Sequence, residues 1–160
     1  MPDDDETADK YILADNKFRA AGMDWYELSN WSKPGSECKH NLFYWYGENW
    51  WGAGPGAHSH INGRRWWNVK HPEIYKEKIL GATDPTAGSE ELTQEEKEEE
   101  RLLLNIRLPQ GIKLSSLSVA QHKVLEEFLN DGHLSREQWD AGSVSLTQSG
   151  RLLADRIVGL

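Results

Sequence analysis

Hydrophobic residues in the first third of the chain change from helical to extended spacing. Ala8, Tyr11, Ile12 and Phe18 recur at nearly helical intervals, and the pattern stops at Gly22, a residue type common just after helices. It therefore predicts a helix over 5–21. Turn-forming residues divide the next positions into shorter elements. These are a strand at 24–29, a loop at 30–37, a helix of one or two turns at 38–46 and a buried strand at 50–54.

A hairpin and a helix are indicated after the glycine-rich loop that follows. Asn62-Gly63 is a strong type I′ turn signal, and it predicts a hairpin of strands 57–61 and 64–69. Pro72 suits the first position of a helix, because its missing N–H has no helical partner there. That helix is expected to run to about Leu80.

The second half of the chain predicts a mainly helical domain. Residues 82–91, ATDPTAGSEE, are polar and rich in turn formers, which predicts a linker. Thr93 with Glu96 forms a capping box that starts a helix. The elements expected here are this helix to Leu108, a helix at 118–130, a hairpin of Leu134–Trp139 with Ser143–Leu146, and a final helix capped by Thr147. Their order indicates a winged-helix-like domain over 92–160, in a chain that is α/β to α+β overall.

Length, composition and charge exclude several classes of protein. The 160 residues, 38% of them hydrophobic, suffice for one domain or two small ones. The chain has neither an apolar run near the roughly 20 residues of a membrane span nor a secretory signal at its start. One cysteine excludes an internal disulfide and fits a reducing, cytoplasmic compartment. The net charge of −8 disfavours nucleic acid as a partner.

Eleven of the 26 acidic residues are concentrated in two runs, at 3–6 and at 90–100. Paired carboxylates can perform acid–base chemistry or bind metals. Both runs, however, lie at predicted helix starts, where the helix dipole favours negative charge. We therefore interpret them as solvated helix termini.

Residues with binding chemistry gather between positions 25 and 71. This stretch holds seven of the eight tryptophans, the only cysteine, Cys38, and a glycine-rich loop. It also holds four of the six histidines, namely His40, His58, His60 and His71. Aromatic faces, imidazoles and a glycine loop together suit a flat, apolar, metal-bearing ligand. Ordinary packing of the tryptophans and a sugar-binding tryptophan platform are the alternatives.

Two local motifs have simpler interpretations. Residues 52–57 fit the dinucleotide pattern G-x-G-x-x-A, but an Asn-Gly hairpin follows where that fold requires a helix, so we reject a Rossmann site. Close approach of this loop to another ligand stays open. Cys38 and His40 cannot supply the four ligands of a structural zinc site. His40 taken alone is either a hydrogen-bonded loop histidine or a ligand.

Two segments resemble a known family. YELSNWSKPGSECKHNLFYW (26–45) and GAGPGAHSHING (52–63) are similar to the distal part of oxygen-independent coproporphyrinogen III oxidase-like radical SAM proteins. The H-N-x-x-Y-W element, from His40 to Trp45, resembles the haem-chaperone branch. The alternative within the family is a true coproporphyrinogen III oxidase, which decarboxylates propionate side chains in haem synthesis. Outside the family, the alternative is a non-catalytic protein-interaction module.

The resemblance implies two sites and no catalytic residue in this chain. A haem site would use an imidazole nitrogen of His40 on the iron, with stacking or packing beside it. Its implied residues are His40, Asn41, Tyr44 and Trp45. A segment near S-adenosylmethionine in the parent protein would comprise Gly52, Gly54, Gly56 and Ala57. Cys38 would point away from His40 in a helix, so the two are not expected to ligate one iron.

The family also implies what this chain lacks. Its members hold a [4Fe–4S] cluster through C-x-x-x-C-x-x-C, with S-adenosylmethionine at the remaining iron, whereas this chain has one cysteine. We therefore expect a fragment without radical chemistry of its own, in which residues 1–81 are the last part of an incomplete barrel. Expected partners are haem or porphyrin and a haem-acceptor protein. Strand edges and apolar surface left by the incomplete barrel predict self-association.

Overall fold

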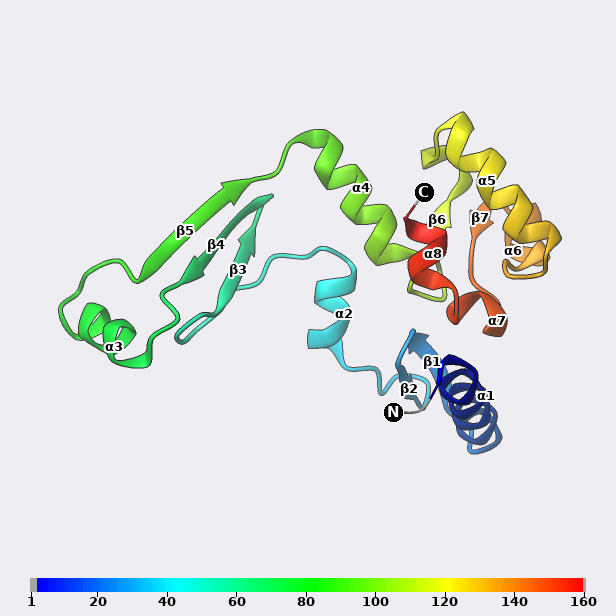
Figure 1. Ribbon diagram of the computed structural model, residues 1–160, viewed down its shortest axis with the longest axis horizontal. Helices are drawn as coiled ribbons and strands as arrows, with labels where there is room; N and C mark the ends of the chain where they lie inside the picture. Colours follow the sequence, from blue (N-terminus) through cyan, green and yellow to red (C-terminus); the bar gives the residue numbers. More distant parts are fainter. Residues whose placement is uncertain (1–2, 160) are drawn as a thin grey trace. The chain divides into compact units, whose positions relative to one another are not determined.

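The computed structural model describes residues 3–159, which form two units (Figure 1). The split unit comprises the chain up to Trp45 together with the chain from Leu102 onward. The middle unit runs from Tyr46 to Arg101. This division differs from the sequence-based boundaries 1–81, 82–91 and 92–160, because the first helix contacts the last third of the chain rather than residues 46–81. Residues 1, 2 and 160, at the outer ends of those predicted regions, lie outside the described residues.

The N-terminal part of the split unit follows the predicted pattern closely. Its elements are α1 (Asp4–Ala20), β1 (Asp24–Glu27), β2 (Asn30–Ser32) and α2 (Lys39–Trp45). The Asp3 carboxylate caps α1 by accepting from the Glu6 N–H at 2.7 Å, and Gly22 follows the helix with φ of 75°. β1 and β2 pair antiparallel, with Trp25 opposite Trp31. The expected loop at 30–37 therefore begins with a short strand.

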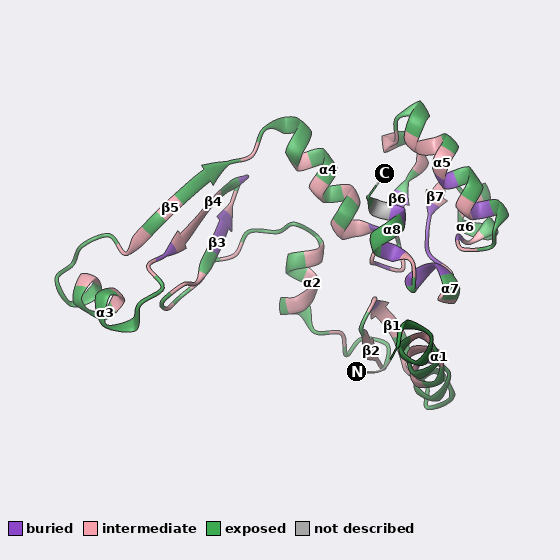
Figure 2. Cartoon of the chain, in the orientation of Figure 1, coloured by how far each residue is buried: buried purple, intermediate pink, exposed green. Residues whose placement is uncertain are grey.

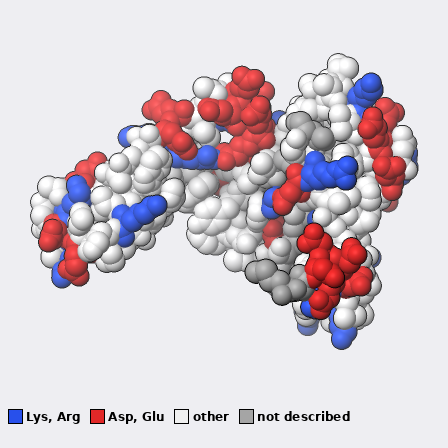
Figure 3. All heavy atoms as spheres, viewed as in Figure 1, with Lys and Arg blue, Asp and Glu red and all other residues white. Residues whose placement is uncertain are grey.

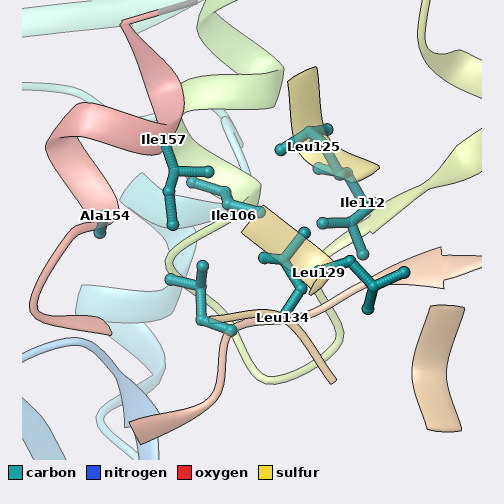
Figure 4. Packing of buried hydrophobic residues seen from close by; sticks show 9 residues of the cluster. Ile106, Ile112, Leu125, Leu129, Leu134, Ala154 and Ile157 are labelled. Carbon is teal, nitrogen blue, oxygen red and sulfur yellow. The ribbon is translucent and has the colours of Figure 1, made fainter. Parts of the chain in front are cut away.

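The C-terminal part of the split unit contains the hydrophobic core. Its elements are the end of α4 (Gln94–Asn105), β6 (Ile112–Lys113), the 3-10 turn η1 (Leu114–Ser116), α5 (Val119–Asn130), α6 (Arg136–Asp140), β7 (Ser143–Val144), α7 (Gln148–Arg151) and α8 (Ala154–Val158). Apolar side chains from these elements meet in one cluster, part of which Figure 4 shows. The buried members are Ile106, Ile112, Leu125, Leu129, Leu134, Val144, Leu146, Ala154 and Ile157. Figure 2 shows buried positions gathered on α5, β7, α7 and α8.

Two elements of this part differ from the sequence-based expectation. The prediction of a hairpin of Leu134–Trp139 with Ser143–Leu146 was wrong. The Ser135 hydroxyl caps the helix α6 in the first segment, and β7 pairs with β6 instead. Only a single bridge joins Leu134 to Leu146. The final helix does start at the Thr147 cap, but it is interrupted after α7 and resumes as α8.

A buried ion pair joins α1 to α7. Arg151 donates from Nη1 and Nη2 to the two carboxylate oxygens of Asp15 at 2.9 and 2.7 Å. Trp31 and Gln148 donate to the same carboxylate at 2.6 and 2.7 Å. Burial alone would raise the pKa of Asp15, but the hydrogen bonds from Arg151, Trp31 and Gln148 outweigh it and lower the pKa from 3.8 to about 2. The Arg151 guanidinium also lies over the Trp25 ring, 4.7 Å from its centroid.

The middle unit is built on a three-stranded antiparallel sheet. Its strands β3 (His58–Ile61), β4 (Arg64–Asn68) and β5 (Thr86–Glu91) lie in the order β3-β4-β5, and α3 (Pro72–Leu80) connects β4 to β5. Asn62 and Gly63 have φ of 52° and 83°, which confirms the expected type I′ turn. The predicted helix start at Pro72 and the Thr93–Glu96 capping box are confirmed as well.

Two expectations for the middle unit were wrong. The supposed linker at 82–91 contains β5, whose polar residues pair with β4 at an exposed edge, where Gly88 leaves room for the Trp67 ring. An added Cβ at Gly88 would lie 2.6 Å from Trp67 Cζ2. The supposed buried strand at 50–54 is reduced to one bridge between Trp50 and His60, because the chain turns at Gly54, where φ is 112°.

The middle unit lacks an apolar core of its own. Among its described residues no hydrophobic side chain is fully buried, and the Trp51 side chain is 72% exposed. Acidic side chains cover the starts of α1 and α4, as Figure 3 shows, in agreement with their interpretation as solvated helix termini. Within residues 3–159, none of the helices combines the length and the hydropathy that crossing a bilayer requires.

Candidate functional site

The H-N-x-x-Y-W residues lie on α2, where four-residue spacing brings side chains together in pairs. His40 and Tyr44 form one pair: the Tyr44 hydroxyl lies 3.2 Å from His40 Nε2, and the rings meet edge to face with centroids 5.1 Å apart. Both side chains are exposed. The expectation that they share a helix face is therefore confirmed.

Asn41 and Trp45 form the second pair, on a different side of the helix. The Trp45 indole N–H donates to Asn41 Oδ1 at 2.6 Å. The backbone carbonyl of Trp45 accepts from the side-chain amide of Asn105 at 2.9 Å, and the Arg107 guanidinium lies over the Trp45 ring, 5.4 Å from its centroid. The four residues thus divide into an exposed pair and a pair held against the end of α4.

The exposed pair can present an imidazole to a ligand. Aromatic surface continues beside it, since Phe43 is 48% and Tyr44 38% exposed. Nε2 of His40 faces the Tyr44 hydroxyl, so an iron atom would bind Nδ1 or would displace that hydroxyl from Nε2. Either arrangement leaves Tyr44 beside the ligand.

Cys38 belongs to neither of these residue pairs. It precedes α2, where its backbone carbonyl accepts from the Leu42 N–H, and its thiol is exposed. No group of three or more His, Cys, Asp or Glu side chains in residues 3–159 is placed to hold a metal ion. A single exposed cysteine does not supply the several thiolates that an iron–sulfur cluster requires.

The glycine loop belongs to the middle unit, apart from the split unit that carries His40. Gly52 is required by its surroundings, because an added Cβ would lie 2.0 Å from the His58 carbonyl oxygen. Gly54 and Gly56 have φ of 112° and 69°, which side chains disfavour.

The N–H groups of this loop are engaged within the middle unit. Those of Gly52, Gly54, Gly56 and Ala57 donate to Ser59 Oγ, Tyr75 Oη, the Val69 carbonyl and the Gly54 carbonyl, respectively. Two of its carbonyl groups are engaged as well, because the Gly54 carbonyl accepts from Asn68 Nδ2 and the Ala57 carbonyl accepts from the Asn68 N–H. The loop therefore offers mainly Cα surface to a ligand.

The remaining histidines of the aromatic stretch lie on the sheet of the middle unit or beside it. The His58 ring stacks on Trp67 with centroids 5.7 Å apart, and the buried His60 ring lies 4.8 Å from that of Trp50. His71 precedes α3 as its N-cap residue. The stretch that looks continuous in sequence thus contributes to two separate units.

Sequence reasoning missed Asn105 and Arg107, which contact α2. They follow Trp45 by about 60 residues, and no local pattern marks either as a partner of that helix. Arg107 also pairs with Asp155 of α8, and its Nε is buried without a hydrogen-bond partner among the described residues.

Comparison with known proteins identifies the family. No family model matches the chain. The haem chaperone HemW of Mycobacterium tuberculosis is 50% identical over 157 residues, covering 98% of this chain and 40% of that protein. HemW of Bacillus subtilis is 32% identical, and the match covers 99% of this chain and 43% of that protein. A solved structure of the radical SAM coproporphyrinogen III oxidase HemN of Escherichia coli matches with a TM-score of 0.73 at 15% identity. This match covers 99% of this chain and 41% of the HemN chain.

These matches define the class of protein by its fold and the branch of the family by sequence identity. The fold is that of the corresponding part of a coproporphyrinogen III oxidase-like radical SAM protein, with mixed α/β structure. By its sequence identities, the chain belongs to the haem-chaperone branch of that family. It spans about two fifths of the length of the relatives that it matches (40–43%).

Proposed function

We propose that this chain is part of a radical SAM haem chaperone and that it binds haem at α2 through His40. The observation that carries the proposal is the exposed His40–Tyr44 pair on α2. The Asn41–Trp45 pair of the same helix is held by a hydrogen bond from Asn105. An imidazole nitrogen on iron with an aromatic ring beside the macrocycle is a common form of haem ligation. In this function the chain holds haem as cargo for transfer to an acceptor protein.

The chaperone is favoured over the oxidase by sequence. The relatives at 50% and 32% identity are named haem chaperones, whereas the oxidase structure shares 15% identity and therefore supports the fold alone. We also propose that residues 1–81 are the last part of an incomplete barrel and that residues 92–160 are a winged-helix-like domain.

We propose that Gly52, Gly54, Gly56 and Ala57 lie near S-adenosylmethionine in the complete protein. Their small size supports close approach of a ligand to the backbone. Because their N–H groups and the carbonyl groups of Gly54 and Ala57 are already engaged, contact would be made mainly through Cα surface. The [4Fe–4S] cluster would be held by thiolates that this chain does not supply.

Titration with haemin tests the haem site. The wild-type chain is expected to shift the Soret band with saturable stoichiometry, and His40→Ala is expected to abolish the shift. His58→Ala is the matched control, because His58 is also exposed and lies beside an aromatic ring, but in the middle unit. An equal loss with His58→Ala would move the site to the sheet, and an unshifted wild-type spectrum would refute haem binding by this chain.

A further inference from the structure

We infer that Asn105 and Arg107 are positioning residues for haem binding: they clamp the Asn41–Trp45 side of α2 and thereby fix the direction of His40. This inference rests on the proposed haem site. Both residues lie in the split unit with α2, Asn105 as the last residue of α4 and Arg107 two residues beyond it. Neither contacts His40 itself in any hydrogen bond or ring contact found among the described residues.

A helix as short as α2 needs support from outside. It has seven residues, and isolated helices shorter than about 12 residues are marginal in water. The last carbonyl groups of any helix lack partners within the helix. The Asn105 side-chain amide donates to one of these, the Trp45 carbonyl, at 2.9 Å. Asn105 therefore closes the C-terminal end of α2.

Arg107 fixes the rotation of α2 about its own axis. Its guanidinium covers one face of the Trp45 ring, while the indole N–H of the same ring is held by Asn41. The ion pair with Asp155 directs the guanidinium, whose side chain is mostly buried. With Trp45 fixed in this way, the His40–Tyr44 pair remains on an exposed side of the helix.

This arrangement has a consequence for affinity. A ligand that meets an already ordered imidazole does not have to order the helix as it binds. Loss of the clamp would therefore weaken haem binding while leaving the ligand at His40. We expect an increase of about tenfold in the haemin dissociation constant for the loss of one clamp contact.

Two substitutions test the clamp. Asn105→Asp keeps the shape of the side chain but removes the N–H donor to the Trp45 carbonyl. Arg107→Met keeps apolar length but removes the planar cation, and Arg107→Lys restores the charge. The control is Asn130→Asp at the end of α5, because Asn130 serves as an acceptor for Arg136 and Asp retains that role.

Two measurements keep the clamp and the haem site distinguishable. The first is hydrogen–deuterium exchange without haem: α2 amides should exchange faster in Asn105→Asp and Arg107→Met, with α5 unchanged and Arg107→Lys in between. The second is haemin titration, with the wild-type band shape retained at about tenfold weaker affinity.

Each result decides one question. Unchanged α2 exchange in both variants would overturn the clamp. Faster exchange with haemin affinity within twofold of wild type would overturn its role in positioning His40. A wild-type chain that binds no haemin would refute the proposed function, while exchange would still decide whether α2 is clamped.

Discussion

Replacing Asp15 by Asn should cost the split unit a large share of its stability. The carboxylate accepts four hydrogen bonds, two of them from Arg151, and both partners of this ion pair are buried. Asn has one acceptor oxygen, and its NH2 group would face donors of Arg151 or its neighbours. The substitution also leaves the Arg151 charge buried without a counter-charge.

Two estimates bound the loss in free energy of unfolding. The pKa of Asp15 falls from 3.8 to about 2, so neutralising the carboxylate removes about 2.5 kcal/mol at neutral pH, at 1.36 kcal/mol per pKa unit. Breaking a buried pair by removing one partner typically costs about 3–5 kcal/mol. We therefore expect a loss of roughly 2–5 kcal/mol, against a total of about 5–15 kcal/mol for a typical domain.

Urea unfolding followed by circular dichroism measures this loss. If the dependence of the unfolding free energy on urea concentration is unchanged, the shift of the transition midpoint gives the loss in stability. Glu6→Gln is the matched control on the same helix, because Glu6 pairs with Lys10 at the surface. It should change stability by less than about 1 kcal/mol. An Asp15→Asn variant no less stable than Glu6→Gln would refute the argument that the buried pair ties α1 to α7.

Three further predictions follow from pH, packing and surface. Because the folded pKa of Asp15 is lowered, its contribution of about 2.5 kcal/mol is present above pH 3.8 and should disappear as pH falls through 2, which urea midpoints across this range will show. Gly52→Ala should destabilise the middle unit by about 1–3 kcal/mol, because the new Cβ would overlap the His58 carbonyl; unchanged limited proteolysis would contradict this. With Trp51 exposed and no fully buried apolar side chain in the middle unit, the chain should self-associate at micromolar concentration, and a monomer by light scattering would contradict this.

A fifth prediction concerns radical chemistry. After reconstitution with iron and sulfide, the 160-residue chain should release no 5′-deoxyadenosine from S-adenosylmethionine, because its single cysteine cannot hold the cluster. Product analysis by chromatography measures this directly. Turnover by the reconstituted chain would contradict the thiolate argument.

The amino-acid sequence by itself determined the features whose partners lie within a few residues. Gly22 after the first helix, the Asn62-Gly63 turn and the Thr93–Glu96 capping box were all predicted and are all present. The shared face of His40 and Tyr44 was predicted for the same reason, since helical geometry alone brings residues four apart together.

Tertiary structure decided what depends on distant partners. The segment of β5 lacks a strand-like pattern and becomes a strand because β4 pairs with it. Asp15 meets Arg151 across 136 positions, and Asn105 meets Trp45 across 60. Such contacts form when hydrophobic burial has already brought the segments together, so neither partner carries a local signal of the other. The sequence therefore indicated the helix for which we propose haem binding, whereas only the folded chain shows which of its sides is anchored and which is exposed.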